Sequence, residues 1–358
     1  MRTARQPADM NRQAGAIAPA LLAWHAQHGR HDLPWQRDPT PYRVWVSEIM
    51  LQQTQVATVI GYFDRFIARF PDVAALAAAP LDEVLHLWSG LGYYSRARNL
   101  HRAAQIIVAQ HGGELPGDAA ALAELPGIGR STAAAIRALS SGDREAILDG
   151  NVRRVLARYF AVAGAPSERA VQQKLWRLAE ECTPPQDVAR YTQAIMDLGA
   201  TLCVRSRPLC AACPLHEPCT ARRDGRQHEL PTPRVRAPRR TESVVMLFAR
   251  ARDGSVLLER RAERGVWGGL WCPPQFPSVE AAREFAQQHL TSAHVEPRSR
   301  SMLRHAFTHF ELEISPLHAK CEGFSGVKED APMLWYNPAS PERLGLPAPV
   351  TTLIQGLT

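Results

Sequence analysis

Four cysteines lie close together in one short stretch of the chain. Their spacing is C-x6-C-x2-C-x5-C, formed by Cys203, Cys210, Cys213 and Cys219. Four thiolates so close together indicate a metal site, because soft sulfur ligands hold zinc or an iron–sulfur cluster and a disulfide needs only two. The start of the chain, residues 1–13, is polar and basic and lacks an apolar signal segment, which disfavours disulfides. Spacing alone leaves zinc and an iron–sulfur cluster equally open.

A carboxylate occurs within an otherwise apolar helical segment. Glu48 belongs to the segment VWVSEIML, and its neighbours at i−4, i−3 and i+3 are Val44, Trp45 and Leu51. A carboxyl group on an apolar helical face loses its hydration, so its pKa should rise toward the range of a general acid. The alternative is a surface glutamate that points away from the core.

A second carboxylate precedes a predicted helix. Asp149 stands before Gly150-Asn151-Val152, which opens a helix through Phe160. An aspartate at this position is often only an N-cap. The N–H groups that a cap receives would also keep the carboxylate ionised. A raised acid and a persistent anion together suit the cleavage of a glycosidic bond through a cation-like transition state.

The segment LPGIG joins two predicted helices, residues 119–124 and 130–139. Its glycines, Gly127 and Gly129, let the backbone approach a ligand closely and leave N–H groups free at the start of the second helix, where a phosphate can bind. An ordinary helix connection with a C-cap glycine is the alternative. The segment is similar to the helix-hairpin-helix element that binds the DNA backbone without reading its sequence.

The overall charge agrees with a polyanionic partner. The chain has a formal net charge of +7 and a pI near 9.2, and 39 of its 42 cationic side chains are arginine. A mild positive charge can also serve solubility alone. No apolar run approaches the length of a membrane span, so we expect no membrane partner.

The elements that position these residues fall into two groups. Helical spacing prevails between Ile17 and Ala221, and predicts helices over residues 42–52, 61–70, 81–88, 95–111 and 171–182. Strands are predicted over residues 243–249, 256–260 and 310–317, with a hairpin turn at Asp253-Gly254 and a helix over residues 280–290. We therefore predict a flexible basic N-terminus (1–13), an all-α catalytic domain (14–221) with a cysteine loop (203–219), an Arg/Pro-rich linker (222–241) and an α+β domain (242–358).

Several long motifs resemble one family of DNA repair enzymes. The cysteines, LPGIG, LDGNV (148–152) and MLQQTQV (50–56) resemble the endonuclease III superfamily, and SEIMLQQT (47–54) with GLGYYSRAR (90–98) resembles its MutY family of adenine DNA glycosylases. The resemblance implies one [4Fe-4S] cluster on the four cysteines. It further implies that Glu48 protonates adenine and that Asp149 stabilises the sugar cation with Asn151 nearby. The implied DNA contacts of a flipped-base complex are Gln52, Gln53, Tyr93, Gly127, Gly129, Arg130 and Ser131.

The second domain resembles a Nudix fold that has lost its metal site. The segment GVWGGLW (265–271) is similar to the family's segment there, whereas Arg283-Glu284 is followed by FAQQ instead of the acidic residues a Nudix hydrolase needs. The resemblance implies a recognition module that reads 8-oxoguanine opposite the adenine. Its reading loop is Phe307-Thr308-His309, in which threonine replaces the family's usual serine and keeps the hydroxyl group.

The resemblance implies a monomer that acts on duplex DNA with A:8-oxoguanine or A:G mispairs, in the cytoplasm near the nucleoid. One alternative is a bifunctional glycosylase and lyase, which needs a lysine amine for a Schiff base. In those relatives the lysine follows the hairpin, where this chain has Ser131, and Lys174 is the one lysine in the first 225 residues. Another alternative is a non-enzymatic iron–sulfur DNA-binding protein, which gives Glu48 and Asp149 no task.

Overall fold

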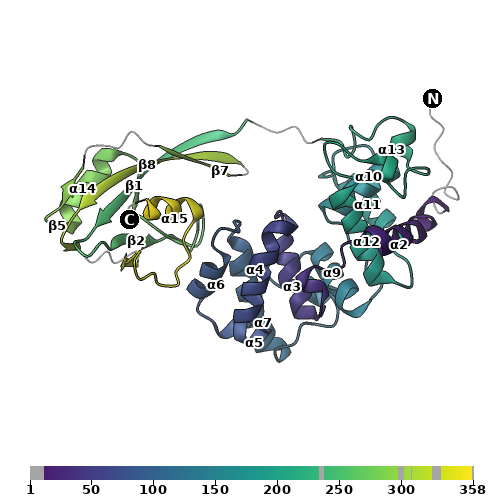
Figure 1. Cartoon of the computed structure of the whole chain (residues 1–358), viewed down its shortest axis with the longest axis horizontal. Helices are drawn as coiled ribbons and strands as arrows, with labels where there is room; N and C mark the ends of the chain where they lie inside the picture. Colours follow the sequence, from purple (N-terminus) through teal and green to yellow (C-terminus); the bar gives the residue numbers. More distant parts are fainter. Residues whose placement is uncertain (1–11, 234–237, 297–301, 308, 325–331, 357–358) are drawn as a thin grey trace. The chain divides into compact units, whose positions relative to one another are not determined.

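The computed structural model describes residues 12–233, 238–296, 302–307, 309–324 and 332–356 (Figure 1). The chain divides into two compact units. The first comprises Met1–Ala77 and Arg102–Val235, and the second comprises Ala78–His101 and Arg236–Thr358. The second unit therefore includes a helical segment from the first third of the sequence. The domain boundaries at residues 14, 222 and 242 stay a prediction.

Helices build the first unit, as the sequence predicts. The start of α3 shows why: Thr40 Oγ1 accepts the backbone N–H of Arg43 at 3.3 Å, and Pro41 occupies the first helical position. No helix in the described ranges is long and apolar enough to cross a membrane. The elements are α2 (Ile17–His28), η1 (Pro34–Gln36), α3 (Pro41–Leu51), α4 (Val56–Arg69), α5 (Val73–Ala78), α8 (Ala119–Ala123), α9 (Arg130–Ser141), α10 (Gly150–Tyr159), α11 (Arg169–Cys182), α12 (Val188–Thr201), η2 (Cys210–Ala212) and α13 (Thr220–Arg223).

A hydrophobic core of the first unit lies between α2, α10, α11 and α12. Leu21, Leu156, Tyr159, Leu175 and Leu198 are almost completely buried in it. Burying a side chain of this size contributes roughly 1.5–3 kcal/mol. Helix α12 also packs against α9, and α9 packs against α3. These contacts join the helix that carries Glu48 to the helix that Asp149 caps.

The predicted helix-hairpin-helix element is formed by α8 and α9, which pack against each other. Gly127 in the connecting turn has φ 81°, a left-handed conformation that glycine adopts without steric cost. Gly129 is the N-cap of α9 and has no side chain with which to cap it. The first N–H groups of α9 are thus available to an anion.

A mixed β-sheet dominates the second unit. Its strand order is β10-β2-β1-β8-β6, while β3 pairs with β2, β4 with β1 and β7 with β8. Strands β1 and β8 run parallel from the pair Arg240–Phe310 to the pair Arg250–Lys320. The elements are α6 (Leu81–Trp88), the first part of α7 (Ser95–His111), which continues into the first unit, β1 (Arg240–Arg250), β2 (Val256–Arg260), β3 (Trp271–Cys272), β4 (Gln275–Phe276), α14 (Val279–His289), β5 (Leu290–Thr291), β6 (His294–Val295), β7 (Leu303–Ala306), β8 (Phe310–Lys320), β9 (Gly323–Phe324), β10 (Met333–Tyr336) and α15 (Ala348–Gln355).

The sequence predictions for this sheet are confirmed. The three predicted strands lie within β1, β2 and β8, and the predicted helix lies at α14, whose apolar side packs on the sheet (Figure 1). Gly254 has φ 87° in the turn between β1 and β2, where Ala251 N–H donates to the carbonyl of Ser255 at 2.8 Å. The parallel pairing of β1 with β8 was not predicted, because local alternation does not say which distant strand becomes the neighbour.

Candidate active site and cysteine pocket

Helix α3 carries Glu48 between buried apolar residues. Part of the Glu48 residue is accessible, but its carboxyl group is crowded by protein atoms, and this burial raises its pKa to about 8. The negative charge of Asp149 is the second cause of the rise. The structure thus brings the two predicted carboxylates into electrostatic contact. At neutral pH Glu48 holds a proton that it can give to a base.

Asp149 forms the N-cap of α10, as predicted. Its Oδ1 atom accepts the backbone N–H of Val152 at 2.8 Å. The residue before it is fixed from the hairpin, because the N–H of Leu148 donates to Ser131 Oγ at 2.9 Å. Ser131 therefore holds the backbone that leads into Asp149, a contact that the sequence did not predict.

Asn151 is held by an arginine from the next turn of its own helix. Arg154 Nη2 donates to Asn151 Oδ1 at 2.7 Å and to the carbonyl of Gly199 at 2.6 Å, and its Nε donates to the carbonyl of Cys203 at 2.7 Å. A Cβ atom on Gly199 would lie 2.6 Å from Asn151 Cβ, so only glycine fits there. Sequence reasoning missed Arg154 and Gly199, although the i+3 spacing from Asn151 could have suggested Arg154.

Two of the predicted DNA contacts have strained backbones. Gln53 has φ 59° and Tyr93 has φ 49°, in the left-handed region that non-glycine residues rarely adopt. Such conformations often occur at functional sites, where the surroundings hold them in place. Gln52, at the end of α3, lies 3.5 Å from Thr132 Oγ1 through its side-chain amide. The Tyr93 side chain, in the second unit, is 44% exposed.

Arg130 follows the hairpin but contacts protein groups. Its guanidinium lies 3.9 Å from the centre of the Trp176 ring and 2.6 Å from Glu180 Oε1. Both partners belong to α11. Arg130 is largely exposed, so the pair is solvated and contributes little to stability.

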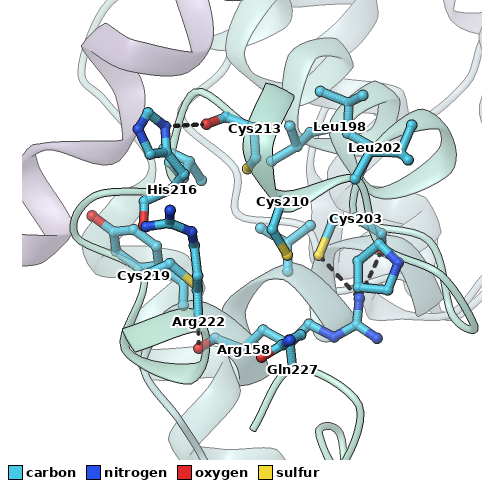
Figure 2. A pocket seen from close by; sticks show the side chains of 15 residues that line it. Arg158, Leu198, Leu202, Cys203, Cys210, Cys213, His216, Cys219, Arg222 and Gln227 are labelled. Atoms are coloured by element: carbon cyan, nitrogen blue, oxygen red, sulfur yellow. Dashed lines mark hydrogen bonds between the residues drawn. The ribbon is translucent and has the colours of Figure 1, made fainter. Parts of the chain in front are cut away.

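The four predicted cysteines line one pocket (Figure 2). Cys203 follows α12, Cys210 begins η2, Cys213 follows it, and Cys219 caps α13. Burial raises the pKa of the Cys213 thiol to about 12, so a thiolate there needs a positive partner such as a metal. Among the described residues, no three Cys, His, Asp or Glu side chains are arranged to hold a single metal ion.

A buried arginine forms the floor of this pocket. Arg158 is 3% exposed, and its Nη1 donates to Cys203 Sγ at 3.3 Å and to the carbonyl of Val204 at 2.8 Å. Its other nitrogens donate to the carbonyls of Arg205 at 3.0 Å and Leu230 at 2.8 Å. Within the described part of the chain, no carboxylate pairs with Arg158. A buried cation without a counter-ion is costly, which points to an anionic group in the pocket.

The predicted lesion-reading loop is described in part. Phe307 stacks on Phe310 with ring centres 4.6 Å apart and lies 5.7 Å from the Trp267 ring. His309 is exposed. Thr308 lies outside the described residues.

The chain is similar in sequence to families and proteins of DNA repair. Residues 46–181 match the model of the HhH-GPD superfamily of base excision DNA repair proteins, and residues 244–356 match the NUDIX domain model. It is 37% identical over 338 residues to an adenine DNA glycosylase of Buchnera aphidicola subsp. Acyrthosiphon pisum, covering 94% of this chain and 95% of that protein. It is 46% identical over 224 residues to the Homo sapiens adenine DNA glycosylase, covering 60% of this chain and 41% of that one.

Solved structures show the same fold for the helical part. A thermostable thymine-DNA glycosylase matches with a TM-score of 0.55 and 27% identity, covering 60% of this chain and 98% of that chain. An endonuclease III–DNA complex matches with a TM-score of 0.52 and 20% identity, covering 63% of this chain and 99% of that chain. At this identity the likeness to endonuclease III shows a shared fold and no more.

Proposed function

Because the chain belongs to the adenine DNA glycosylase family, a family of base excision repair enzymes that hydrolyse an N-glycosidic bond, we propose that it removes adenine paired with 8-oxoguanine or guanine. The enzyme turns the adenine out of the duplex and releases it without cutting the strand. The observation that carries this proposal is the buried Glu48, whose pKa is raised to about 8 beside the anion Asp149.

Acid and anion have separate tasks in this reaction. Glu48 gives its proton to a ring nitrogen of adenine, so that the base leaves as a neutral molecule. The sugar then carries positive charge at the carbon that held the base, and Asp149 stabilises this charge until water adds there and gives a proton to the Glu48 carboxylate. Asn151, held by Arg154, lies in the turn that Asp149 caps, and Asp149 itself is held by the N–H of Val152. Glu48 lies in the motif SEIMLQQT, and Asp149 and Asn151 lie in the motif LDGNV.

The lysine inventory supports a monofunctional enzyme. A lyase needs an amine nucleophile at the sugar, and Lys174 is the one lysine in the first 225 residues. Lys174 lies in α11, outside the motifs. At the position where the lyases have lysine, Ser131 Oγ accepts the N–H of Leu148. A hydroxyl group cannot form a Schiff base, so this position supplies no nucleophile for lyase chemistry.

We infer that the cysteine pocket holds one [4Fe-4S] cluster. Cys203, Cys210, Cys213 and Cys219 would be its ligands, and the lining of one pocket by all four residues supports this assignment. A cluster with four thiolates carries negative charge, which fits the buried Arg158. When bound, it supplies a rigid anionic anchor for the loop that bears Arg205 and Arg207, so that both can meet DNA phosphates.

The second unit is proposed to read the base opposite the adenine. In α14, Arg283-Glu284 is followed by FAQQ and not by the acidic pattern of a Nudix hydrolase, which supports a recognition role over metal-dependent hydrolysis. The reading loop is Phe307-Thr308-His309, and the rings of Trp267 and Phe310 pack against Phe307, the first residue of this loop. We further propose that the enzyme works as a monomer in the cytoplasm near the nucleoid.

A strand-incision assay tests the proposed removal of adenine without strand cleavage. Duplexes with A:8-oxoguanine, A:G and A:T pairs are incubated with the enzyme and then treated with alkali or left untreated. We expect cleavage only after alkali, with A:8-oxoguanine cut fastest and A:T left intact. Cleavage without alkali would identify a lyase, and binding without any cleavage would identify a DNA-binding protein.

A further inference from the structure

Two bulky aromatic residues of the second unit have a left-handed backbone. Tyr93 has φ 49° and Trp267 has φ 55°. Large side chains rarely adopt this conformation, and the surrounding structure must hold them in it. Tyr93 is exposed and is a proposed DNA contact, whereas Trp267 is 7% exposed and belongs to no assigned site. The role of Trp267 therefore needs an explanation from its contacts.

Trp267 supports the base of the proposed reading loop. Its ring centre lies 5.7 Å from that of Phe307 and 5.9 Å from that of His305. The turn around Trp267 is closed tightly: a Cβ atom on the next residue, Gly268, would lie 2.1 Å from the carbonyl oxygen of Glu263. The left-handed backbone of Trp267 and this close approach together place the indole ring against Phe307.

Arg98 joins this turn to the segment that carries Tyr93. Its Nη1 atom donates to the carbonyl of Gly268, and its backbone N–H donates to the carbonyl of Tyr94 at 3.1 Å. The Tyr94 hydroxyl group in turn donates to the carbonyl of Leu346 at 3.3 Å and accepts the N–H of Gly90 at 3.2 Å. All of these residues belong to the second unit. The residue whose guanidinium holds the turn beside Phe307 is thus fixed, through its backbone, to the segment that carries Tyr93.

We propose that Arg98 is a positioning residue that couples the Tyr93 turn to the Phe307 loop and thereby sets the preference for 8-oxoguanine over guanine. The proposal rests on the function proposed above. Without the bond from Arg98, the carbonyl of Gly268 loses its charged donor and the strained turn at Trp267 can relax. The indole ring then no longer fixes Phe307, and the enzyme reads the opposite base less well while adenine removal continues.

Full-length variants with matched controls test this coupling. Arg98→Met removes the donors and keeps the apolar stem, Arg98→Lys keeps the charge, and Arg102→Met changes an exposed arginine on the same helix. Single-turnover kcat/KM is measured on A:8-oxoguanine and A:G duplexes, with thermal unfolding alongside. Arg98→Met should lower the ratio of the two kcat/KM values roughly tenfold, Arg98→Lys should lower it less, and Arg102→Met should leave it unchanged.

A double variant decides whether the two sites act together. In Phe307→Ala the ratio is already lowered, and adding Arg98→Met should lower it no further, because both changes break the same link. Independent effects that multiply would overturn the coupling, and so would an equal loss of rate on both duplexes. If Arg98→Met fails to fold, Arg98→Lys carries the same test. If the wild-type chain shows no preference for 8-oxoguanine, the function proposed above is overturned as well. If the Arg98 variants keep the wild-type preference, only the coupling is overturned.

Discussion

The negative charge of Asp149 adds to the rise in the pKa of Glu48 that burial causes. The two carboxyl groups come from segments about 100 positions apart in the sequence, and the packing of α3 on α9 and of α9 beside α12 brings them together. The pair therefore keeps one proton at neutral pH, and that proton resides on the more buried Glu48.

The first prediction concerns the pH dependence of adenine removal. Glu48 acts in its protonated form, so the single-turnover rate should be level below neutral pH and fall as the pH rises through about 8. Glu48→Gln should bind A:8-oxoguanine duplex but lose roughly 10²–10⁴-fold or more in rate, because an amide has no proton to give. A wild-type rate in Glu48→Gln would remove this residue from the mechanism.

Asp149→Asn separates the capping role from the catalytic role. Asparagine caps a helix about as well as aspartate, so the melting temperature should change little. The rate should nevertheless fall by at least roughly 10²-fold, because an amide cannot balance the charge on the sugar. Calorimetry and single-turnover excision on the same preparation provide the comparison. If stability and rate fall together, capping is the better account of Asp149.

Replacing one ligand should remove the cluster. Cys210→Ser should lose the brown absorbance and the iron of the wild-type protein and bind duplex DNA more weakly at physiological salt. Cys321→Ala, a change at a buried cysteine of the other unit, serves as the control and should keep its iron. Metal analysis and a DNA titration measure both effects. A colourless wild-type protein with one zinc contradicts this prediction.

Gly199 should tolerate no side chain. In Gly199→Ala the new Cβ would meet Asn151 Cβ at 2.6 Å and the Asn151 backbone at 3.1 Å, so α10 and α12 must move apart. Overpacking of this kind costs about 1–3 kcal/mol, and the displaced Asn151 should lower the excision rate too. Gly61→Ala on the exposed side of α4 is the matched control and should stabilise the protein by roughly 0.5–1 kcal/mol. Equal unfolding free energies for the two variants would contradict the packing argument.

Thr308→Ala should weaken the preference for 8-oxoguanine. The resemblance gives the hydroxyl group of this residue one hydrogen bond to the lesion, and such a bond contributes about 0.5–1.5 kcal/mol. The ratio of excision rates on A:8-oxoguanine and A:G duplexes should therefore fall by the corresponding factor, about 2- to 13-fold, while Thr308→Ser should keep the wild-type ratio. A full-length variant is the cleaner test, because deletion from Glu242 onward would also remove the Leu346 partner of Tyr94.

Local patterns in the sequence predicted a buried carboxyl group and a group of four cysteines. The apolar neighbours of Glu48 predicted its raised pKa, and the spacing of the four cysteines predicted one pocket. The raised pKa of Glu48 and the shared pocket of the cysteines agree with these patterns, which rest on residues close together in the chain. Whether the predicted residues perform the proposed steps stays a prediction until the assays above are done.

Other parts of the site depend on contacts that no local pattern contains. In a chain with 39 arginines, nothing in the sequence distinguishes the buried Arg158 from those on the surface. The grouping of residues 78–101 with the second unit was also missed. A helical period tells which side of a helix is apolar but not which core receives it. The bond from Arg98 to Gly268 joins positions 170 apart in sequence.

The guanidinium of Arg158 holds two stretches of chain, Cys203–Arg205 and Leu230, around one positive charge. If the cluster neutralises this charge, a chain made without iron keeps a buried cation without a counter-ion and is less stable. Cellular proteases would then degrade such a chain, so that it would not accumulate as an inactive enzyme. Iron supply would then set how many repair molecules a cell contains, while the rate of each finished molecule stays the same.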